Sequence, residues 1–185
     1  MIGLLQPLET ERLILRPFEI TDAGTVRQLA GDREVAATTV NIPHPYPEGA
    51  GEQFVAFTRE AAAGGFGYTY AVVRKSDGIL VGCIGLVGTN SVHRRAELNY
   101  WIGRPYWRQG YASEAARRMV QFGFERLDLN KISAAHFTRN PASGKVMQKA
   151  GMTYEGTHRQ DILKGGQFED IATYSILRAE FEARR

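Results

Sequence analysis

Hydrophobic and polar positions alternate with two different periods along the chain. The clearest helical pattern follows Gly110, where Ala115, Ala116, Met119, Val120, Phe122 and Phe124 recur at spacings near three and four, with Arg117, Arg118 and Gln121 between them. This spacing predicts an amphipathic helix from about Ser113. The preceding segment, Tyr106 to Ala112, is predicted to leave a strand and turn tightly into that helix.

Shorter apolar runs predict the other elements. Strands are expected at 13–17, 68–74, 79–87, 95–102, 131–137, within 153–158 and at 168–177. Helices are expected from an N-cap at Thr21-Asp22 through Leu29, over 51–63, and in a short stretch ended by Gly151. The polar tail from Glu180 to Arg185 is expected to fray. This order of elements suits a mixed α+β fold.

Three prolines between Asn41 and Pro47 forbid regular structure and predict a stiff extended loop. On the residues alone, this loop is either a rigid connection or one border of a binding site.

Length and composition fit one globular domain. The 185 residues are 43% hydrophobic and 23% charged, with no apolar run long enough to cross a membrane. The segment from Met1 to Leu8 has an apolar patch but neither the basic region nor the long apolar region of a signal peptide. The single cysteine, Cys83, cannot form an internal disulfide. We therefore expect a cytoplasmic protein without a membrane partner.

The formal net charge is +3, and the basic residues are spread along the chain, so nucleic acid is not indicated as a partner. An anionic cofactor would suffice to explain this balance. Arg104 and Arg108, which flank the turn before the long helix, are the basic candidates for such a site. The four histidines have no metal-ligand spacing, so no metal is expected.

The turn into the long helix has features of an anion site. The first amides of a helix have no partner inside it, and the helix dipole adds partial positive charge there. Gly110 and the small Ala112 leave room for a ligand to approach the backbone. The alternative is an ordinary strand-to-helix turn, because one glycine before a helix is weak evidence.

Two motifs make the sequence more specific. The first, Trp107-Arg108-Gln109-Gly110-Tyr111-Ala112, resembles the Gln/Arg-x-x-Gly-x-Gly/Ala acyl-CoA loop of the GNAT N-acetyltransferases, although Trp107 stands in place of the usual Gln or Arg. The second, from Asn140 to Met152, resembles the later Asn-x-x-Ser/Ala-x-x-Val/Leu-x-x-Lys-x-Gly-Phe/Met motif. With the segments 96–102 and 174–178, these motifs are similar to the RimJ/RimL branch, the ribosomal-protein N-terminal acetyltransferases.

The resemblance covers about residues 9–181 of a single domain, 1–185. It implies a central, mostly antiparallel twisted sheet flanked by helices, in which two strands splay apart to admit the pantetheine arm of acetyl-CoA. The residues implied to bind this cofactor are Trp101, Ile102, Arg104, Arg108, Gln109, Gly110, Tyr111, Ala112, Ser113, Asn140, Ser143 and Lys145.

Acetyl transfer needs a neutral amine, and a protein α-amino group has a pKa of about 8, so a base or a water chain leading to one must remove a proton. Glu97 is the candidate, because a half-buried carboxylate on an apolar strand would have a raised pKa. Its alternative role is an ion pair with Arg94, Arg95 or another cation.

The departing thiolate needs a hydrogen-bond donor. Many family members carry a tyrosine seven positions after the motif asparagine, but Met147 stands there and cannot donate a proton. Ser143 matches a serine proposed to contact the thioester sulfur in RimL-like enzymes, and a hydroxyl can donate without ionising. Alternatively, Ser143 caps a helix that starts at Gly144. Asn140 is expected to bond the pantetheine amides or to close the loop.

Three functions remain open. The first is acetylation of a protein N-terminus by direct attack in a ternary complex, since no Cys/His pair indicates a covalent intermediate. The second is acetylation of a small amine such as a polyamine, an antibiotic or a metabolite. The third is a non-catalytic acyl-CoA-binding module. The presence of Glu97 and Ser143 argues against the third. A small polycation needs several acids, and near the proposed cleft only Glu97, Glu155, Glu169 and Asp170 are expected, which favours the first over the second. The oligomeric state is undetermined, and a homodimer is one option.

Overall fold

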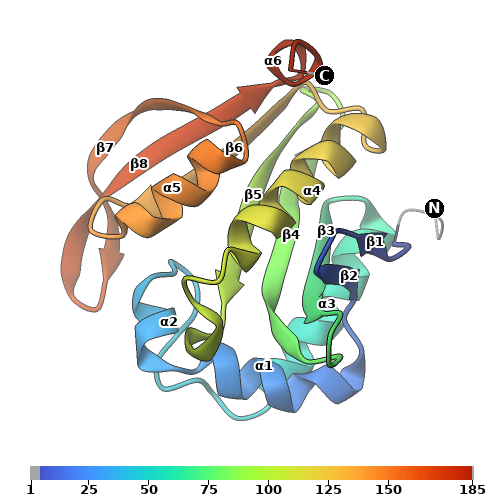
Figure 1. The fold of residues 1–185 in the computed structure, drawn as a ribbon. Helices are drawn as coiled ribbons and strands as arrows, with labels where there is room; N and C mark the ends of the chain where they lie inside the picture. Colours follow the sequence, from blue (N-terminus) through green and yellow to red (C-terminus); the bar gives the residue numbers. More distant parts are fainter. Residues whose placement is uncertain (1–4, 185) are drawn as a thin grey trace.

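A computed structural model describes residues 5–184, and its centre is one eight-stranded sheet (Figure 1). The strands lie in the order β1-β2-β3-β4-β5-β6-β8-β7, and every neighbouring pair is antiparallel except β5 and β6. The strands are β1 (Leu8–Glu9), β2 (Leu13–Pro17), β3 (Gly67–Arg74), β4 (Leu80–Asn90), β5 (Arg95–Ile102), β6 (Lys131–Phe137), β7 (Thr153–Lys164) and β8 (Gln167–Leu177). The mostly antiparallel α+β sheet expected from the sequence is therefore present.

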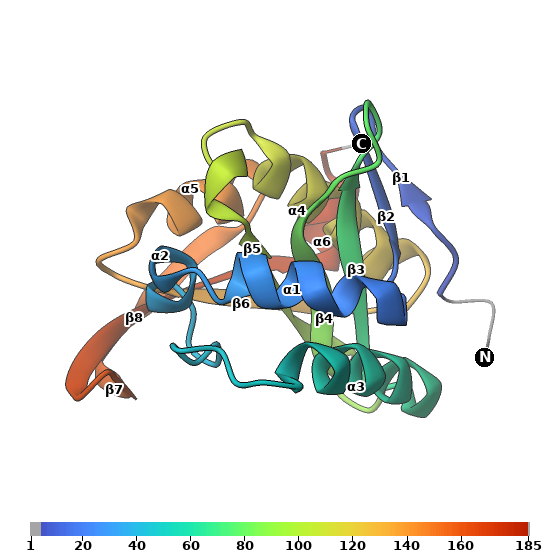
Figure 2. The same ribbon diagram turned by 90° about the horizontal axis from the view of Figure 1, so that it is seen from below.

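Helices cover both faces of this sheet. They are α1 (Ala23–Ala30), α2 (Arg33–Ala37), α3 (Ala50–Gly64), α4 (Tyr111–Glu125), α5 (Pro141–Lys149) and α6 (Arg178–Glu182), with 3₁₀ turns at Ile20–Asp22 and Arg104–Tyr106. In Figure 1, α4 and α5 lie in front of the strands, and in Figure 2 α3 lies on the far side of the strands from them.

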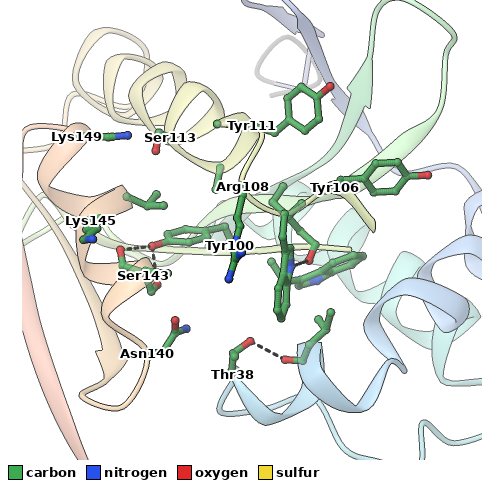
Figure 3. A pocket seen from close by; sticks show the side chains of 18 of the residues that line it. Thr38, Tyr100, Tyr106, Arg108, Tyr111, Ser113, Asn140, Ser143, Lys145 and Lys149 are labelled. Atoms are coloured by element: carbon green, nitrogen blue, oxygen red, sulfur yellow. Dashed lines mark hydrogen bonds between the residues drawn. The ribbon is translucent and has the colours of Figure 1, made fainter. Parts of the chain in front are cut away.

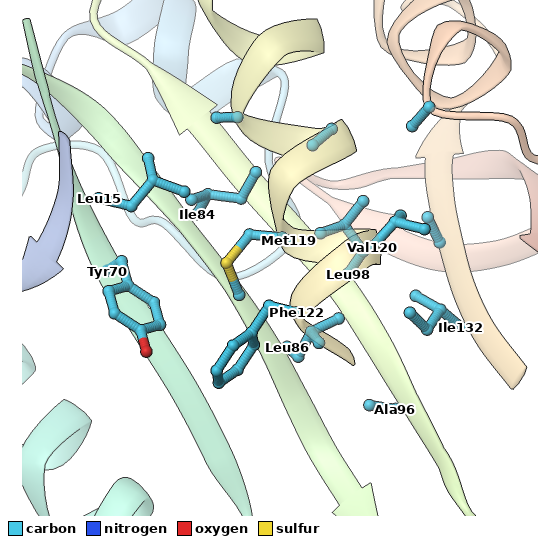
Figure 4. Packing of buried hydrophobic residues seen from close by; sticks show 14 of the residues in the cluster. Leu15, Tyr70, Ile84, Leu86, Ala96, Leu98, Met119, Val120, Phe122 and Ile132 are labelled. Carbon is cyan, nitrogen blue, oxygen red and sulfur yellow. The ribbon is translucent and has the colours of Figure 1, made fainter. Parts of the chain in front are cut away.

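Each face has its own buried cluster. On one face, Met119 and Phe122 of α4 pack between Leu15, Ile84 and Leu98 of the sheet (Figure 4). On the other face, a second cluster joins α1 and α3 to side chains of β3, β4 and β5, among them Trp101. This alternation along β5 is what a strand buried on both faces requires, because successive side chains point to opposite sides.

The parallel pair β5 and β6 separates early. Only three residue pairs join the two strands: Arg95 with Lys131, Ala96 with Ile132 and Glu97 with Ser133. β5 continues to Ile102 and β6 to Phe137 without further pairing between them. The splay implied by the family resemblance is thus present, and it begins directly after Glu97.

Several predicted boundaries were wrong. Helix α4 begins at Tyr111 rather than Ser113, and β7 continues to Lys164 rather than ending at His158. Helix α5 begins at Pro141 with Asn140 as its N-cap residue, so Ser143 is its third residue and does not cap a helix starting at Gly144. The capping alternative for Ser143 is therefore excluded.

Three short elements were not predicted: β1, α2 and α6. The expected fraying of the tail is wrong for residues 180–182, which belong to α6, and Arg184 donates a hydrogen bond to the Gly151 carbonyl. Residues 1–4 of the N-terminal segment and Arg185 lie outside the described residues. Within residues 5–184, no helix is both long and apolar enough to span a membrane.

Candidate active site

A cavity of about 480 Å³ lies beside the end of β5, where β5 no longer pairs with β6. Its walls come from α2, the end of β5, the turn before α4, the first turn of α4 and one side of α5 (Figure 3). The lining residues are Val35, Thr38, Thr39, Tyr100, Trp101, Ile102, Tyr106, Trp107, Arg108, Gly110, Tyr111, Ala112, Ser113, Asn140, Ala142, Ser143, Lys145, Val146 and Lys149. None of these side chains is acidic, and three are basic.

The outer end of the cavity has the geometry of an anion site. Gly110 adopts a left-handed conformation with φ 84° and precedes the first residue of α4, and Arg108 also has a positive φ of 62°. The first helical hydrogen bond runs from the Glu114 amide to the Gly110 carbonyl, so the amides of the three residues between them are not used inside the helix. These amides lie at the positive end of the α4 dipole, which favours binding of a negatively charged group.

Three cations also line the cavity. Arg108 reaches into the cavity from the turn, while Lys145 and Lys149 line it from successive turns of α5 (Figure 3). A pyrophosphate at the N-terminus of α4 would therefore meet both backbone amides and positive side chains.

Arg12 and Glu114 hold the turn that precedes α4, which we call the anion turn. The Arg12 guanidinium donates to the Glu114 carboxylate through Nε at 2.7 Å and to the Gln109 carbonyl through Nη1 at 3.0 Å. The Thr10 hydroxyl and the Arg12 amide also donate to Glu114. Burial acts to raise the pKa of Glu114, but these hydrogen bonds and the Arg12 charge hold it below its ordinary value.

At the inner end, Tyr100 of β5 reaches across the opening to α5. Its hydroxyl lies 2.7 Å from the Ser143 hydroxyl and 3.0 Å from the Ser143 carbonyl oxygen (Figure 3). Burial is the main cause that raises the pKa of Tyr100 to about 12, so the phenol stays protonated at neutral pH. Two hydroxyl groups are thus side by side in the region where the two strands diverge.

Trp107, the departure from the usual acyl-CoA loop, has a defined position. Its indole Nε1 donates a hydrogen bond of 2.6 Å to the Ile102 carbonyl, the last residue of β5. The ring therefore folds back along the cavity wall and joins the turn to the end of the strand. The backbone of β5 before Ile102 stays open toward β6 and can pair with an extended ligand as a further strand would.

Glu97 does not line this cavity. Together with Arg95, Lys131, Ser133 and Glu155, it lines a second cavity of about 300 Å³, completed by Ala134, Ala135, His158 and Thr173. Among residues 5–184, its carboxylate has no hydrogen-bond or ion-pair partner, so the alternative role, a pairing with Arg94, Arg95 or another cation, is absent. Glu97 is exposed by surface area, yet partial burial raises the pKa of its carboxyl above the ordinary value.

The segment after α2 borders the cavity opposite α5. Thr38 and Thr39 line it, and the three-proline loop follows directly. Lys164, at the β7–β8 turn, donates to the carbonyls of Val40 at 3.2 Å and Ile42 at 2.7 Å. Arg139 donates to the Ala37 carbonyl. The start of the loop is therefore tied to the C-terminal half of the chain and follows directly after two cavity-lining residues.

Most of the residues expected to bind the cofactor are brought together. Those that line the cavity are Trp101, Ile102, Arg108, Gly110, Tyr111, Ala112, Ser113, Asn140, Ser143 and Lys145. Arg104 and Gln109 do not: Arg104 lies in the preceding 3₁₀ turn, and the Gln109 side chain donates to the Pro105 carbonyl. Neither residue lines the cavity, so their expected contact with the cofactor stays a prediction.

Sequence reasoning missed the contributions of α2, Tyr100, Tyr106 and Lys149. Lys149 follows Lys145 by one helical turn, which is a signal that could have identified it. Tyr100 points to the opposite face of β5 from Glu97 and Trp101, as the sequence spacing predicts. Nothing in the sequence shows that its hydroxyl reaches Ser143. Within the described residues, no group of three or more His, Cys, Asp or Glu side chains could hold a metal ion.

A family model described as an acetyltransferase (GNAT) domain matches residues 12–153. The chain belongs to this family. It is a GNAT N-acetyltransferase, an enzyme that uses acetyl-CoA, and the cavity fits that molecule, because cations, the first residues of α4 and the unpaired end of β5 all line it.

Curated relatives are similar over most of the chain. An uncharacterized N-acetyltransferase of Bacillus subtilis (strain 168), YoaA, is 34% identical over 92% of this chain and 96% of its own length. A putative ribosomal N-acetyltransferase of the same organism, YdaF, is 32% identical over 59% of this chain and 60% of its own length.

Solved structures share the fold. RimL, a ribosomal L7/L12 alpha-N-protein acetyltransferase in complex with coenzyme A, superposes with a TM-score of 0.85 at 16% identity, covering 93% of this chain and 98% of that one. A spermidine N-acetyltransferase of Vibrio cholerae in complex with CoA and spermine has a TM-score of 0.82 at 21% identity, with coverage of 94% and 99%. These likenesses show the fold and leave the acceptor to be argued from the site.

Proposed function

We propose that this enzyme transfers the acetyl group of acetyl-CoA to the α-amino group of a protein or peptide N-terminus. The observation that carries the proposal is that few acidic side chains near the cleft lack a cationic partner. A small polycation needs several unneutralised carboxylates, whereas a peptide N-terminus carries one positive charge and an extended backbone.

The four acids considered near the cleft from the sequence are Glu97, Glu155, Glu169 and Asp170. Glu155 pairs with Lys131 at 2.7 Å, and Glu169 pairs with Arg139 at 2.7 Å. Asp170 accepts a hydrogen bond from the Gln160 amide. Glu97 and Asp170 are the two without an ion-pair partner among the described residues, and Asp170 lines neither cavity. The second cavity contains two carboxylates, Glu97 and Glu155, beside two cations, Arg95 and Lys131. This balance supports an acceptor with one amine.

Glu97 is proposed to accept the amine proton. It lies three residues before Tyr100 on β5, which at about 3.3 Å per residue places their backbones roughly 10 Å apart, and the odd spacing puts the two side chains on opposite faces. A proton removed beside Ser143 would therefore reach Glu97 through bridging water rather than by direct contact. The raised pKa brings the carboxylate closer to the basicity that this role needs.

Ser143 is proposed to donate a hydrogen bond to the departing thiolate. Its hydroxyl lines the cavity, and it belongs to the first turn of α5 without capping it. Asn140 is proposed to bind the pantetheine amides, since its side chain makes no capping hydrogen bond and lines the same cavity.

Direct attack in a ternary complex is supported by the position of Cys83. It is the single cysteine of the chain, it is buried in the cluster under α1 and α3, and burial raises the pKa of its thiol. A thiol that is buried, protonated and outside the cavity cannot carry the acetyl group as a covalent intermediate. The expectations of a cytoplasmic location, a single domain and a possible homodimer stay predictions.

The test is a thiol-release assay with acetyl-CoA and a matched panel of acceptors. The panel contains peptides with a free N-terminus, the same peptides with a blocked N-terminus and one internal lysine, spermidine, spermine and an aminoglycoside. We expect the highest kcat/KM for the free N-termini, with mass spectrometry locating the acetyl group on the α-amine. A kcat/KM for a polyamine or an aminoglycoside above that of every peptide would overturn the proposal.

A further inference from the structure

The Tyr100–Ser143 contact joins two hydroxyl groups at the inner end of the cavity. The Tyr100 oxygen lies within hydrogen-bond distance of both the Ser143 hydroxyl and the Ser143 carbonyl oxygen. Each hydroxyl has one proton, and the carbonyl can only accept. When Tyr100 donates to the carbonyl, the serine proton can point back to Tyr100, and when Tyr100 donates to the serine oxygen, the serine proton is free for a third partner.

The family tyrosine on this helix is missing, and its position could not serve the cavity here. Met147 is 1% exposed, belongs to the buried cluster under α4 and is not among the cavity-lining residues. A phenol nevertheless reaches the cavity side of α5. It comes from β5, through Tyr100, instead of from the helix.

We propose that Tyr100 is a positioning residue for the leaving group. Its phenol donates a hydrogen bond to the Ser143 oxygen, and this orients the Ser143 hydroxyl so that it donates a hydrogen bond to the thiolate sulfur. This inference rests on the proposed role of Ser143 and adds a second residue, from a different element, to it. The pair forms a two-membered donor chain in which the outer hydroxyl contacts sulfur and the inner one fixes its orientation and strengthens its hydrogen bond.

The step balances without a further reactant. The amine nitrogen forms a bond to the acetyl carbon, the carbon–sulfur bond breaks, and its electron pair stays on sulfur as a thiolate. The amine proton leaves toward Glu97. Ser143 and Tyr100 both keep their protons, because a phenol of pKa about 12 is a much weaker acid than a thiol of about 8.5. Their contribution is a hydrogen bond to the developing charge.

The first measurement needs no acceptor. Coenzyme A is bound to the protein, and the ionisation of its thiol is followed by the ultraviolet absorbance of the thiolate as pH is raised. A donor chain that favours the thiolate lowers the thiol pKa, so Tyr100→Phe should raise it by about 0.5 to 1 unit. Tyr154→Phe is the matched control, because it removes a phenol that bonds the Thr157 hydroxyl at 2.8 Å outside both cavities.

The second measurement is a double-mutant cycle on turnover with acetyl-CoA. Tyr100→Phe should lower kcat by about 3- to 10-fold with little change in KM for acetyl-CoA, and Ser143→Ala should lower it further. The double variant should match Ser143→Ala alone, because Tyr100 acts only through Ser143. Melting temperatures within a few degrees of the parent establish that the variants are folded.

Three outcomes would overturn the inference. An unchanged thiol pKa and kcat in Tyr100→Phe would show that the phenol only forms part of the cavity wall. Additive effects of the two substitutions would show that Tyr100 acts independently of Ser143. An effect of Tyr100→Phe without any effect of Ser143→Ala would place the phenol itself on the sulfur. The thiol titration uses no acceptor, so its result tests this inference separately from the proposed peptide acceptor.

Discussion

Arg12 and Glu114 connect the edge of the sheet to the anion turn: the Arg12 Nη2 atom lies 2.7 Å from Glu114 Oε2, and the same guanidinium donates to the Gln109 carbonyl. The pKa of Glu114 is lowered, so this interaction is present above the ordinary glutamate pKa of about 4.3 and is lost only as pH falls through the lowered value. At neutral pH the turn that precedes α4 is therefore held in place before any ligand binds.

Glu114→Gln tests whether this restraint prepares the anion site. The change breaks the ion pair and removes a negative charge close to the proposed pyrophosphate position. Electrostatics alone would make coenzyme A bind more tightly, whereas loss of the restraint should weaken binding by about 3- to 10-fold. Calorimetric titration with coenzyme A distinguishes the two, with Glu9→Gln, which breaks the surface pair with Lys75, as the control. Tighter binding would show that the turn is rigid without Arg12.

Gly110→Pro should abolish detectable coenzyme A binding. Proline fixes φ near −65°, while Gly110 has φ 84°, so the turn could not present the amides of α4. Gly110→Ala is the milder variant and should weaken binding by about 10-fold, because a Cβ there is strained and would meet Arg12 Nη2 at 3.2 Å. Gly78→Ala, also at positive φ but in the β3–β4 turn, controls for strain alone. Parent-like affinity in folded Gly110→Pro would refute this anion site.

Glu97→Gln should lower kcat by about 10²- to 10⁴-fold and leave coenzyme A binding unchanged, since Glu97 lies outside the main cavity. In the parent, activity should fall as pH drops through the raised pKa of Glu97, and this acid limb should vanish in the variant. Because a raised pKa in the folded state removes stability as pH rises, the variant should be no less stable than the parent at pH 7. A pH–rate profile that keeps its acid limb would assign Glu97 a structural role.

Ser143→Ala should lower kcat by up to about 10²- to 10³-fold with a melting temperature close to that of the parent. The serine is the third residue of α5 and not its N-cap, so no capping free energy is lost. Thermal denaturation and steady-state kinetics on the same preparation separate the two effects. Parent-like turnover would mean that the thiolate leaves without help from α5.

Met147→Tyr should fail to restore turnover in the Ser143→Ala background. Met147 is enclosed by the cluster under α4, so a tyrosine there overpacks the core and is expected to cost about 1–3 kcal/mol in the free energy of unfolding. Urea denaturation measures that cost, and the thiol-release assay measures rescue. Recovery of turnover would show that a phenol at this position does reach the sulfur.

Much of the site could be predicted from local sequence. Gly110 followed by an amphipathic pattern places free amides at a helix start, and Asn140 followed by Pro141 places Ser143 in the first turn of the next helix. These features depend on residues within one or two turns of each other. Short-range geometry is therefore sufficient to predict them.

The separation of β5 from β6 depends on distant parts of the chain. β6 pairs with β8 along its whole length, and β4 does the same for β5, so each strand follows its antiparallel partner and the two diverge after Glu97 and Ser133. That divergence creates the cavity, separates Glu97 from it, and brings Tyr100 to Ser143. The hydrophobic period sets which face each side chain points to. How far β5 and β6 stay together depends on their pairing with β4 and β8, which are distant in the sequence, so only the tertiary structure decides it.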